Sequence, residues 1–329
     1  MDARVADTLE RVDYIAEIQR LRKERNAVIL AHYYQEPEIQ DLADFVGDSL
    51  ELSKKAAGTD ADTIVFCGVR FMAEVAKILS PQKRVIIPDM HAGCSLEDSC
   101  PPDEFAAFRA AHPDHLSLTY INCSAAVKAH SDIIVTSSSA EKILNALPPE
   151  QKVIFAPDKH LGSWLSRKTG RPMLLWDGVC IVHEAFSETE LLKLRVQYPD
   201  APIAAHPECP PHILDHADVV GSTSKILEFA LSSPADTIII ATEPHIIHQM
   251  EKHAPHKTFI GAPGADGNCA CNMCPFMALN TIEKLYRVLR DGSNEITIPE
   301  DIRAKAQIPL DRMLAIAEGR ATDLTPALV

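Results

Sequence analysis

Three stretches share one pattern that decides the fold: residues 28–52 (VILAHYYQEPEIQDLADFVGDSLEL), 117–143 (SLTYINCSAAVKAHSDIIVTSSSAEKI) and 202–227 (PIAAHPECPPHILDHADVVGSTSKIL). Each opens with a short apolar run that ends in a polar ring side chain, which is His32, Tyr120 or His206. In every copy an Asp follows twelve residues later, and a Ser or Thr five residues after that. Equal spacing at three positions in three segments indicates an internal triplication.

The pattern continues beyond these stretches. A second apolar run follows in each copy, then a helical pattern, then a third apolar run; the runs are 62–68 and 84–88, 152–158 and 172–176, and 236–242 and 257–261. Short Val- and Ile-rich runs that alternate with helical patterns predict βαβ units and parallel sheets buried on both faces. We therefore expect an α/β protein: three αβα domains, each with a small parallel sheet, related by a pseudo-threefold axis around a central active site.

The repeats also suggest domain boundaries. We expect the first domain at 1–103, the second at 104–188 and the third at 189–277, which are ordinary domain sizes. Residues 276–292 (FMALNTIEKLYRVLRDG) predict a helix that ends at Gly292. The segment 278–329 should pack back on the first domain.

Each copy presents a cysteine shortly after its third apolar run. These cysteines are Cys94, Cys180 and a group of three, Cys269, Cys271 and Cys274. The separations from the repeated hydroxyl to Cys94, Cys180 and Cys274 are 45, 43 and 51 residues. One cysteine per copy would converge on the pseudo-threefold axis, and Cys94 lies nearer its strand end than Cys100 does.

The cysteines leave several alternatives open. Three thiolates could hold zinc or an iron–sulfur cluster, and spacing does not distinguish the two. The segment CACNMC (269–274) could instead form a local zinc knuckle with His253 or His256 as a further ligand. If the convergent site is right, Cys269 and Cys271 are bystanders.

Polar side chains at the strand ends predict a site for proton transfer and anion binding. Side chains two residues apart on an extended strand point the same way, which gives the pairs His32 and Tyr34, Tyr120 and Asn122, and His206 and Glu208. The repeated hydroxyls Ser49, Ser137 and Thr223 each follow a strand and open a helix, so we expect them to cap helix N-termini. Three such N-termini at one centre would bind a multiply anionic small molecule.

Composition narrows the function classes. The formal net charge of −14 argues against a nucleic-acid binder, because phosphate binding needs clustered cations. The first residues lack a signal-peptide pattern, and no apolar run reaches the roughly 18–20 residues of a membrane helix. We expect a cytoplasmic protein without membrane contact. Two rivals remain, a zinc-binding regulatory protein built on CACNMC and a sugar-phosphate-binding protein without catalytic metal; a Rossmann enzyme is disfavoured because G-x-G-x-x-G is absent.

A set of motifs in a fixed order resembles the quinolinate synthase family, the iron–sulfur quinolinate synthase A type. The motifs are AHYYQ (31–35), GDSLE (47–51), GVRFMAE (68–74), AGCSL (92–96), APDKHLG (156–162), CIVHE (180–184), HPE (206–208), VGSTS (220–224) and CPFMALN (274–280). No single motif would suffice, but the set covers most of the chain. The family often has Cys-x-x-Cys-x-x-Cys at the last motif, whereas here the first gap is one residue shorter.

The resemblance implies an enzyme of NAD biosynthesis with a [4Fe–4S] cluster whose one open iron acts as a Lewis acid. It implies a transferase-type condensation of iminoaspartate with dihydroxyacetone phosphate to quinolinate, with release of phosphate and water, and L-aspartate oxidase as the source of iminoaspartate. The implied cluster ligands are Cys94, Cys180 and Cys274. The implied substrate pocket is His32, Tyr34, Ser49, Tyr120, Asn122, Ser137, His206, Glu208, Ser222 and Thr223, with Glu208, His32 and Tyr34 as candidate proton shuttles and His206 as an orienting residue.

Overall fold

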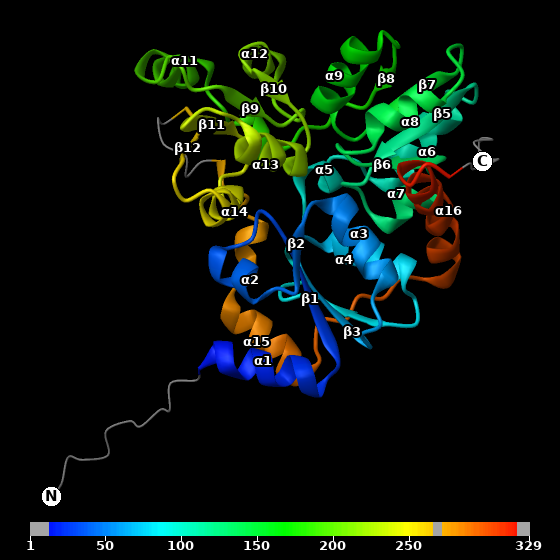
Figure 1. The fold of residues 1–329 in the computed structure, drawn as a ribbon. Coiled ribbons are helices and arrows are strands. Elements are labelled where there is room, and N and C mark those ends of the chain that lie inside the picture. The colour runs from blue at the N-terminus through cyan, green and yellow to red at the C-terminus, as the bar shows by residue number, and fades with distance from the viewer. Residues whose placement is uncertain (1–12, 266–271, 321–329) are drawn as a thin grey trace, which may run out of the picture.

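The structure is a computed structural model that describes residues 13–265 and 272–320. The described residues include three four-stranded sheets, and neighbouring strands within each sheet are parallel (Figure 1). The strand order within each sheet is the same, which confirms the predicted α/β class with three αβα units. In that order the strands are β2 (Phe45–Gly47), β1 (Ala27–His32), β3 (Thr63–Cys67) and β4 (Arg84–Ile86); β6 (Ile133–Val135), β5 (His115–Tyr120), β7 (Lys152–Ala156) and β8 (Leu174–Leu175); and β10 (Val219–Val220), β9 (Ile203–Ala205), β11 (Thr237–Ala241) and β12 (Thr258–Gly261).

The Asp that recurs in the sequence has one structural role in all three sheets. In each copy its Oδ2 accepts a backbone N–H from the first strand of the repeat. The donor and acceptor pairs are Ile29 and Asp44 (2.9 Å), Ser117 and Asp132 (2.8 Å), and Ile203 and Asp218 (2.8 Å). The carboxylate thereby ties the start of the second strand to the first strand, and this explains why the repeat preserves the residue.

Helices cover the sheets and connect their parallel strands, as crossovers between parallel strands require (Figure 1). In the first unit they are α1 (Tyr14–Glu24), α2 (Pro37–Leu42), α3 (Ser49–Gly58), α4 (Arg70–Leu79) and α5 (Ser95–Asp98). The second unit has α6 (Pro102–Ala110), α7 (Ala125–Ala129), α8 (Ala140–Ala146), α9 (Lys159–Thr169) and α10 (Ile181–Glu184). The third has α11 (Glu188–Gln197), α12 (Pro211–Leu214), α13 (Thr223–Ser232) and α14 (Ile246–His253).

The helix expected at 276–292 is divided into two pieces. Met277–Leu279 forms a single 3-10 turn, and α15 (Ile282–Asp291) begins after its N-cap Thr281, whose hydroxyl accepts the N–H of Lys284. The helix therefore starts later than expected, because the Thr cap at 281 favours a new start over continuation. Its end at Gly292 is confirmed: the φ of +62° lies in the left-handed region that glycine adopts most readily.

The two C-terminal helices pack on different units. Apolar residues of α15, namely Leu285, Val288 and Leu289, join the apolar cluster on one face of the first sheet, beside α1. The last helix, α16 (Glu300–Ala317), contacts α4 of the first unit and also α7 and β6 of the second. It therefore bridges two units. The exact domain boundaries stay a prediction.

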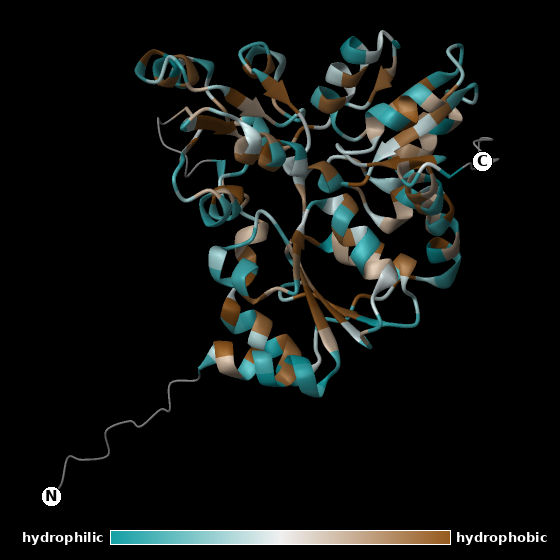
Figure 2. Cartoon of the chain, viewed as in Figure 1, coloured by the Kyte–Doolittle hydropathy of each residue, from teal (hydrophilic) through white to brown (hydrophobic). Residues whose placement is uncertain are grey.

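The apolar cores are distributed unevenly among the sheets. One cluster joins the first and second sheets through Leu30, Leu118 and Phe155, together with Leu310 of α16. The third sheet has its own clusters on its two faces, and few apolar side chains from the other units pack against them, chiefly Tyr33. Figure 2 shows the same arrangement coloured by hydropathy. The strands inside are largely brown, which marks hydrophobic residues, and the outer helices carry many teal, hydrophilic positions.

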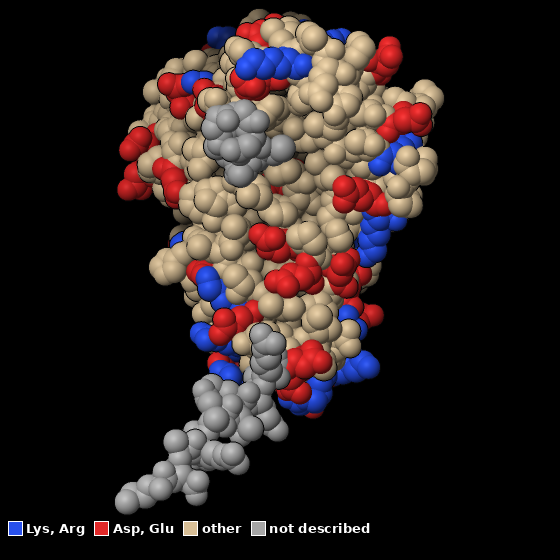
Figure 3. Space-filling model, turned by 90° about the vertical axis from the view of Figure 1, so that its left-hand side faces the viewer, with Lys and Arg blue, Asp and Glu red and all other residues tan. Residues whose placement is uncertain are grey.

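The surface carries mixed charge. On the face drawn in Figure 3, acidic and basic side chains are interspersed among the described residues, without one large basic patch. In residues 13–265 and 272–320 no helix is long and apolar enough to span a membrane.

Candidate functional site

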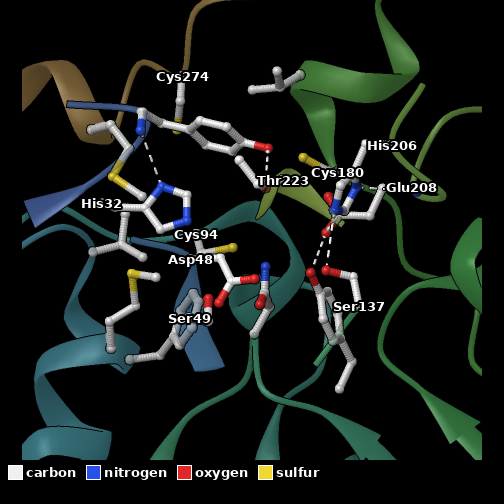
Figure 4. Close-up of a pocket in the computed structure, with 18 of the residues that line it drawn as sticks. His32, Asp48, Ser49, Cys94, Ser137, Cys180, His206, Glu208, Thr223 and Cys274 are labelled. Atoms are coloured by element: carbon white, nitrogen blue, oxygen red, sulfur yellow. Dashed lines mark hydrogen bonds and ion pairs between the residues drawn. The ribbon is translucent and has the colours of Figure 1, made fainter. Parts of the chain in front are cut away.

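A pocket lies where the three units meet, at the carboxyl ends of their strands (Figure 4). Polar loops gather at this end of parallel sheets, which is the usual ligand site of such folds. The pocket encloses about 640 Å³ of atom-free space, part of it open to solvent. The predicted residues that line it are His32, Tyr34, Ser49, Cys94, Tyr120, Asn122, Ser137, Cys180, His206, Glu208, Thr223 and Cys274.

Ser222 is the predicted site residue that does not line this pocket. Its hydroxyl accepts the N–H of Lys225 at 3.3 Å and so caps α13. It lies instead in a neighbouring surface hollow that shares Ser137 with the pocket. Its part in substrate binding therefore stays a prediction.

The helix N-termini at the pocket differ in one respect from the expectation. The expected caps were Ser49, Ser137 and Thr223, whereas the observed N-cap residues are Asp48, Ser139 and Ser222. An N-cap side chain bends back toward its own helix. The shift therefore leaves the hydroxyls of Ser49 and Thr223 at the first helical position, on the pocket wall.

Two buried histidines in the pocket have the same local geometry. Nδ1 of His32 accepts the N–H of Tyr34 at 3.1 Å, and Nδ1 of His206 accepts that of Glu208 at 3.4 Å. Because Nδ1 is an acceptor, the proton of each neutral ring is on Nε2. Burial lowers the pKa of His32 to about 4 and that of His206 to about 3, so both rings are neutral hydrogen-bond donors at pH 7.

Glu208 is the charged centre of the polar wall. Its Oε1 accepts the hydroxyl of Tyr120 at 2.5 Å, and its Oε2 lies 2.9 Å from Nδ1 of His183. Burial alone would raise the pKa of the Glu208 carboxyl. The nearby His206 and His183 outweigh burial and hold this pKa well below its usual value. Burial and the nearby Glu208 raise the pKa of Asp158. The two carboxyls therefore differ in acidity, and Glu208 is the stronger acid.

The sequence reasoning missed His183, which lines the pocket, and Thr242, which contacts two residues of its wall. Oγ1 of Thr242 lies 2.7 Å from the hydroxyl of Tyr34 and 3.0 Å from Nε2 of His183. Polar groups therefore run without interruption from Tyr34 through Thr242 and His183 to Glu208. His183 is part of a motif quoted above, so its residue type was a signal, but only the fold places it beside Glu208.

Asp48 was also missed. Its Oδ1 caps α3, and its Oδ2 accepts the hydroxyls of Ser138 at 2.6 Å and Ser224 at 2.9 Å. These serines belong to the second and third units, so one carboxylate connects the beginnings of three helices. The positive ends of helix dipoles favour a negative charge there.

The three cysteines predicted as ligands share the pocket, and each precedes a helical turn. Cys94 and Cys180 are the N-cap residues of α5 and α10, and Cys274 precedes the 3-10 turn. Their thiols are free. Burial raises the pKa of each thiol, to about 11 for Cys274, while backbone N–H groups of the following turn act in the opposite direction. Bound metal cations reverse the effect of burial, so this donor set fits a thiophilic metal centre.

The alternative metal sites are less well supported by the geometry. Cys100 is buried in a separate apolar cluster with Cys123. Cys269 and Cys271 lie outside the described residues, so the local zinc knuckle stays untested, and the Nδ1 of its possible ligand His253 is paired with a backbone carbonyl.

A single ion could also be considered at Cys180, His183 and Glu208, whose ligand atoms lie within 4.8 Å of one another. However, both carboxylate oxygens of Glu208 already have close polar partners in Tyr120 and His183. The contact with Tyr120 is a hydrogen bond, whereas Nδ1 of His183 lies close to Oε2 without a well-directed hydrogen bond.

Comparison with known proteins agrees with these observations. A family model described as quinolinate synthetase A protein matches residues 16–315. Curated relatives named quinolinate synthase include those of Nostoc sp. (58% identical over 306 residues, 93% of this chain and 94% of the relative), Synechococcus sp. (59% over 305 residues, 93% and 95%) and Thermosynechococcus vestitus (57% over 306 residues, 93% and 96%). The chain belongs to the quinolinate synthetase A family.

Proposed function

We propose that this chain is a quinolinate synthase of NAD biosynthesis, which condenses iminoaspartate with dihydroxyacetone phosphate and releases phosphate and water. Family membership over nearly the whole chain supports the activity. The observation that carries the proposal is the pocket, in which three thiols, three helix beginnings and the carboxylate of Glu208 from three units face a common space.

We propose further that Cys94, Cys180 and Cys274 hold a [4Fe–4S] cluster. The free thiols gather in one pocket, and backbone N–H groups face each sulfur. When bound through three cysteines, such a cluster has one open iron that supplies a Lewis acid to a substrate oxygen.

The other side chains of the pocket suit anionic substrates. Ser49, Ser137 and Thr223 present hydroxyls near helix beginnings, where carboxylate and phosphate oxygens bind well. His32 and His206, both neutral, donate from Nε2 without adding charge. We propose that these residues bind and orient the two substrates. The same role is proposed for Ser222, which lies in the neighbouring hollow.

Asn122 adds a further binding group. Its Oδ1 is buried without a hydrogen-bond partner in the protein. A buried acceptor left unpaired costs roughly 1–3 kcal/mol, so a bound ligand that donates to it relieves part of this cost. An amine, imine or hydroxyl of the substrate fits this position.

Proton transfer is assigned to Glu208 and Tyr34. Glu208 is ionised and accepts a proton, with Tyr120 fixing its Oε1. Burial raises the pKa of Tyr34 well above its usual value, so its hydroxyl stays protonated and donates. Thr242 and His183 link the two groups and allow the proton to be returned.

The proposed substrates also imply a supplier. Iminoaspartate is an imine that water hydrolyses, and it therefore requires continuous production close to the enzyme. We propose L-aspartate oxidase as the source and the cytoplasm as the compartment.

The proposal is tested by the iron, sulfide and zinc content of protein purified without oxygen, together with quinolinate formation from the two substrates. About four irons and four sulfides per chain with turnover are expected. One zinc without sulfide would favour the regulatory zinc protein. Substrate binding that persists when Cys94, Cys180 and Cys274 are all changed to Ser, with no turnover in the unaltered protein, would favour the sugar-phosphate binder.

A further inference from the structure

The three cysteine-bearing loops can be compared position by position, because the sheets share one register. Strand pairing sets Cys67 opposite Ala31 in the first sheet. The equivalent pairs are Ala156 with Thr119 in the second sheet and Ala241 with Ala205 in the third. Three residues beyond these strand positions the chain has Arg70, Lys159 and Pro244.

In the first two repeats this position anchors the cysteine loop through the backbone. The N–H of Arg70 donates to the carbonyl of Ala92 at 2.6 Å, and the N–H of Lys159 donates to the carbonyl of Gly178 at 2.9 Å. Each carbonyl belongs to the residue two positions before the cysteine of that repeat. The same hydrogen bond therefore ties both loops to the end of the central strand.

The third repeat cannot make this hydrogen bond. Pro244 occupies the donor position, and proline has no backbone N–H. The residue before it, Glu243, provides a different connection: its Oε1 accepts the N–H of Cys274 at 3.2 Å. This side chain is fully buried, with 0% of its surface exposed.

The carboxylate of Glu243 is itself fixed from behind. His245 donates its backbone N–H to Oε2 at 2.9 Å, and its Nδ1 lies 2.7 Å from Oε1. The carbonyl of His245 accepts the side chain of Gln40 at 3.1 Å, and its Nε2 lies 3.4 Å from Oε2 of Glu36. Contacts with α2 and the residue before it thus hold the anchor in one orientation.

The residues at the position of Glu243 in the other repeats accompany a backbone anchor. Asp158 in the second repeat caps α9 by accepting the N–H of Leu161 at 2.7 Å, and the backbone N–H of Cys180 also interacts with its carboxyl. In the first repeat the position is Val69, which lines the pocket. Neither side chain has to replace a missing backbone donor, because Arg70 and Lys159 supply one.

We propose that Glu243 is a positioning residue that replaces the backbone anchor lost at Pro244 and holds Cys274 where it can share a metal centre with Cys94 and Cys180. The role in a metal centre rests on the proposed function above. The anchoring of the loop does not, and it can be measured without metal.

The first experiment uses the metal-free chain and measures the alkylation rate of each thiol by peptide mass spectrometry. In Glu243→Ala, Cys274 should be alkylated about tenfold faster than in the unaltered chain, because one hydrogen bond to a carboxylate is lost, while Cys94 keeps its rate. The matched control is Val69→Ala, which truncates the equivalent apolar side chain of the first repeat, where the backbone anchor of Arg70 remains; there Cys94 should keep its rate. An unchanged rate for Cys274 would overturn the proposal whatever metal the protein binds.

The second experiment uses anaerobically loaded protein and follows the loss of iron to a chelator. Glu243→Ala should lose iron several-fold faster than both the unaltered protein and Val69→Ala. Glu243→Gln keeps an acceptor oxygen and should restore most of the retention, which a merely space-filling role of Glu243 would not require. If the Gln and Ala variants lose iron equally fast, the result contradicts the anchoring role of Glu243. If the unaltered protein takes up no iron and sulfide, the proposed function fails, and the alkylation rates alone decide the role of Glu243.

Discussion

The contact between the first and second sheets differs from the contacts that the third sheet makes with either. An apolar core that includes Leu30, Leu118 and Leu310 runs continuously through the first two units. The third unit meets its neighbours largely through polar pairs such as Tyr120 with Glu208. The first arrangement buries apolar area, which stabilises by about 25 cal/mol per Å². The polar contact adds little net free energy of folding, because each hydrogen bond within the protein replaces a hydrogen bond with water.

The difference suggests a division of labour within the pocket. Several of the polar pairs that reach the third unit involve the candidate reacting groups themselves, including Tyr34 with Thr242 and His183 with Thr242. An apolar contact at this place would stabilise more but could not move protons. Substitutions in the apolar contact should therefore cost stability, whereas substitutions in the polar contact should cost turnover.

The largest effect is expected for Glu208→Gln. The amide has the same shape but cannot accept a proton, so turnover should fall by about 10²- to 10⁴-fold. The measurement is quinolinate formation by protein with a determined iron and sulfide content.

Asn122→Ala serves as a comparison for Glu208→Gln, since it removes a binding group and should raise KM more than it lowers kcat. If the Gln variant keeps its turnover, or if it loses its iron, Glu208 is not the proton acceptor and the polar contact is structural.

The next largest effect tests the apolar contact. Leu310→Ala removes a fully buried side chain of α16 and should cost about 2–5 kcal/mol of unfolding free energy. The matched substitution is Ile226→Ala in α13, which is equally buried in a cluster built mainly from the third unit.

Hydrogen exchange separates these two variants. Leu310→Ala should speed exchange in both β1 and β5, whereas Ile226→Ala should speed it mainly in β9 and β11. If both variants speed hydrogen exchange equally in all of these strands, the three units unfold as one. The apolar and polar contacts would then not differ in how they stabilise the units.

The sequence predicted the fold well for a physical reason. Period, turn chemistry and strand length are local properties, and three copies of Asp44, Asp132 and Asp218 repeated the same signal. The convergence of Cys94, Cys180 and Cys274 followed from the repeat as well. Structural features that occur in only one copy of the repeat were harder to predict, as the late start of α15 shows.

The missed pocket residues show where local signals end. Asp48, His183 and Thr242 have neighbours from other units, so their roles depend on contacts far apart in the sequence. Asp48 also illustrates a one-residue ambiguity, since an acidic residue and a serine stand side by side where a cap is needed. The repeat aligned the serine, while the capping box with Glu51 selected the aspartate.

A smaller effect is expected for Tyr34→Phe. The hydroxyl lies 3.0 Å from Oγ1 of Thr223 and 2.7 Å from that of Thr242, so its loss breaks two contacts between the first and third units. Unfolding free energy should fall by about 1–2 kcal/mol, while turnover falls by at least about tenfold. Denaturant titration and steady-state kinetics give the two numbers. A loss of stability with unchanged turnover would remove Tyr34 from the proton path.

The smallest effect is expected at the outer edge of the same contact, at Asp41. Its Oδ1 lies 2.8 Å from Nζ of Lys252 and 3.0 Å from Nε2 of His248, and these two groups lower the pKa of the Asp41 carboxyl. All three side chains are partly exposed, so Asp41→Asn should cost less than about 1 kcal/mol, and about 1 M salt should remove most of that.

The sign of the pH dependence follows from the lowered pKa of Asp41. A carboxyl whose pKa is lower in the folded chain stabilises above its ordinary value of 3.8, and the contribution disappears as the pH falls through the folded pKa. The difference in urea midpoint between the unaltered chain and Asp41→Asn should therefore be present at about pH 5 and shrink below about pH 4. A cost well above 1 kcal/mol that survives high salt would mean that polar contacts do hold the third unit in place, and the two kinds of contact would then differ in chemistry but not in strength.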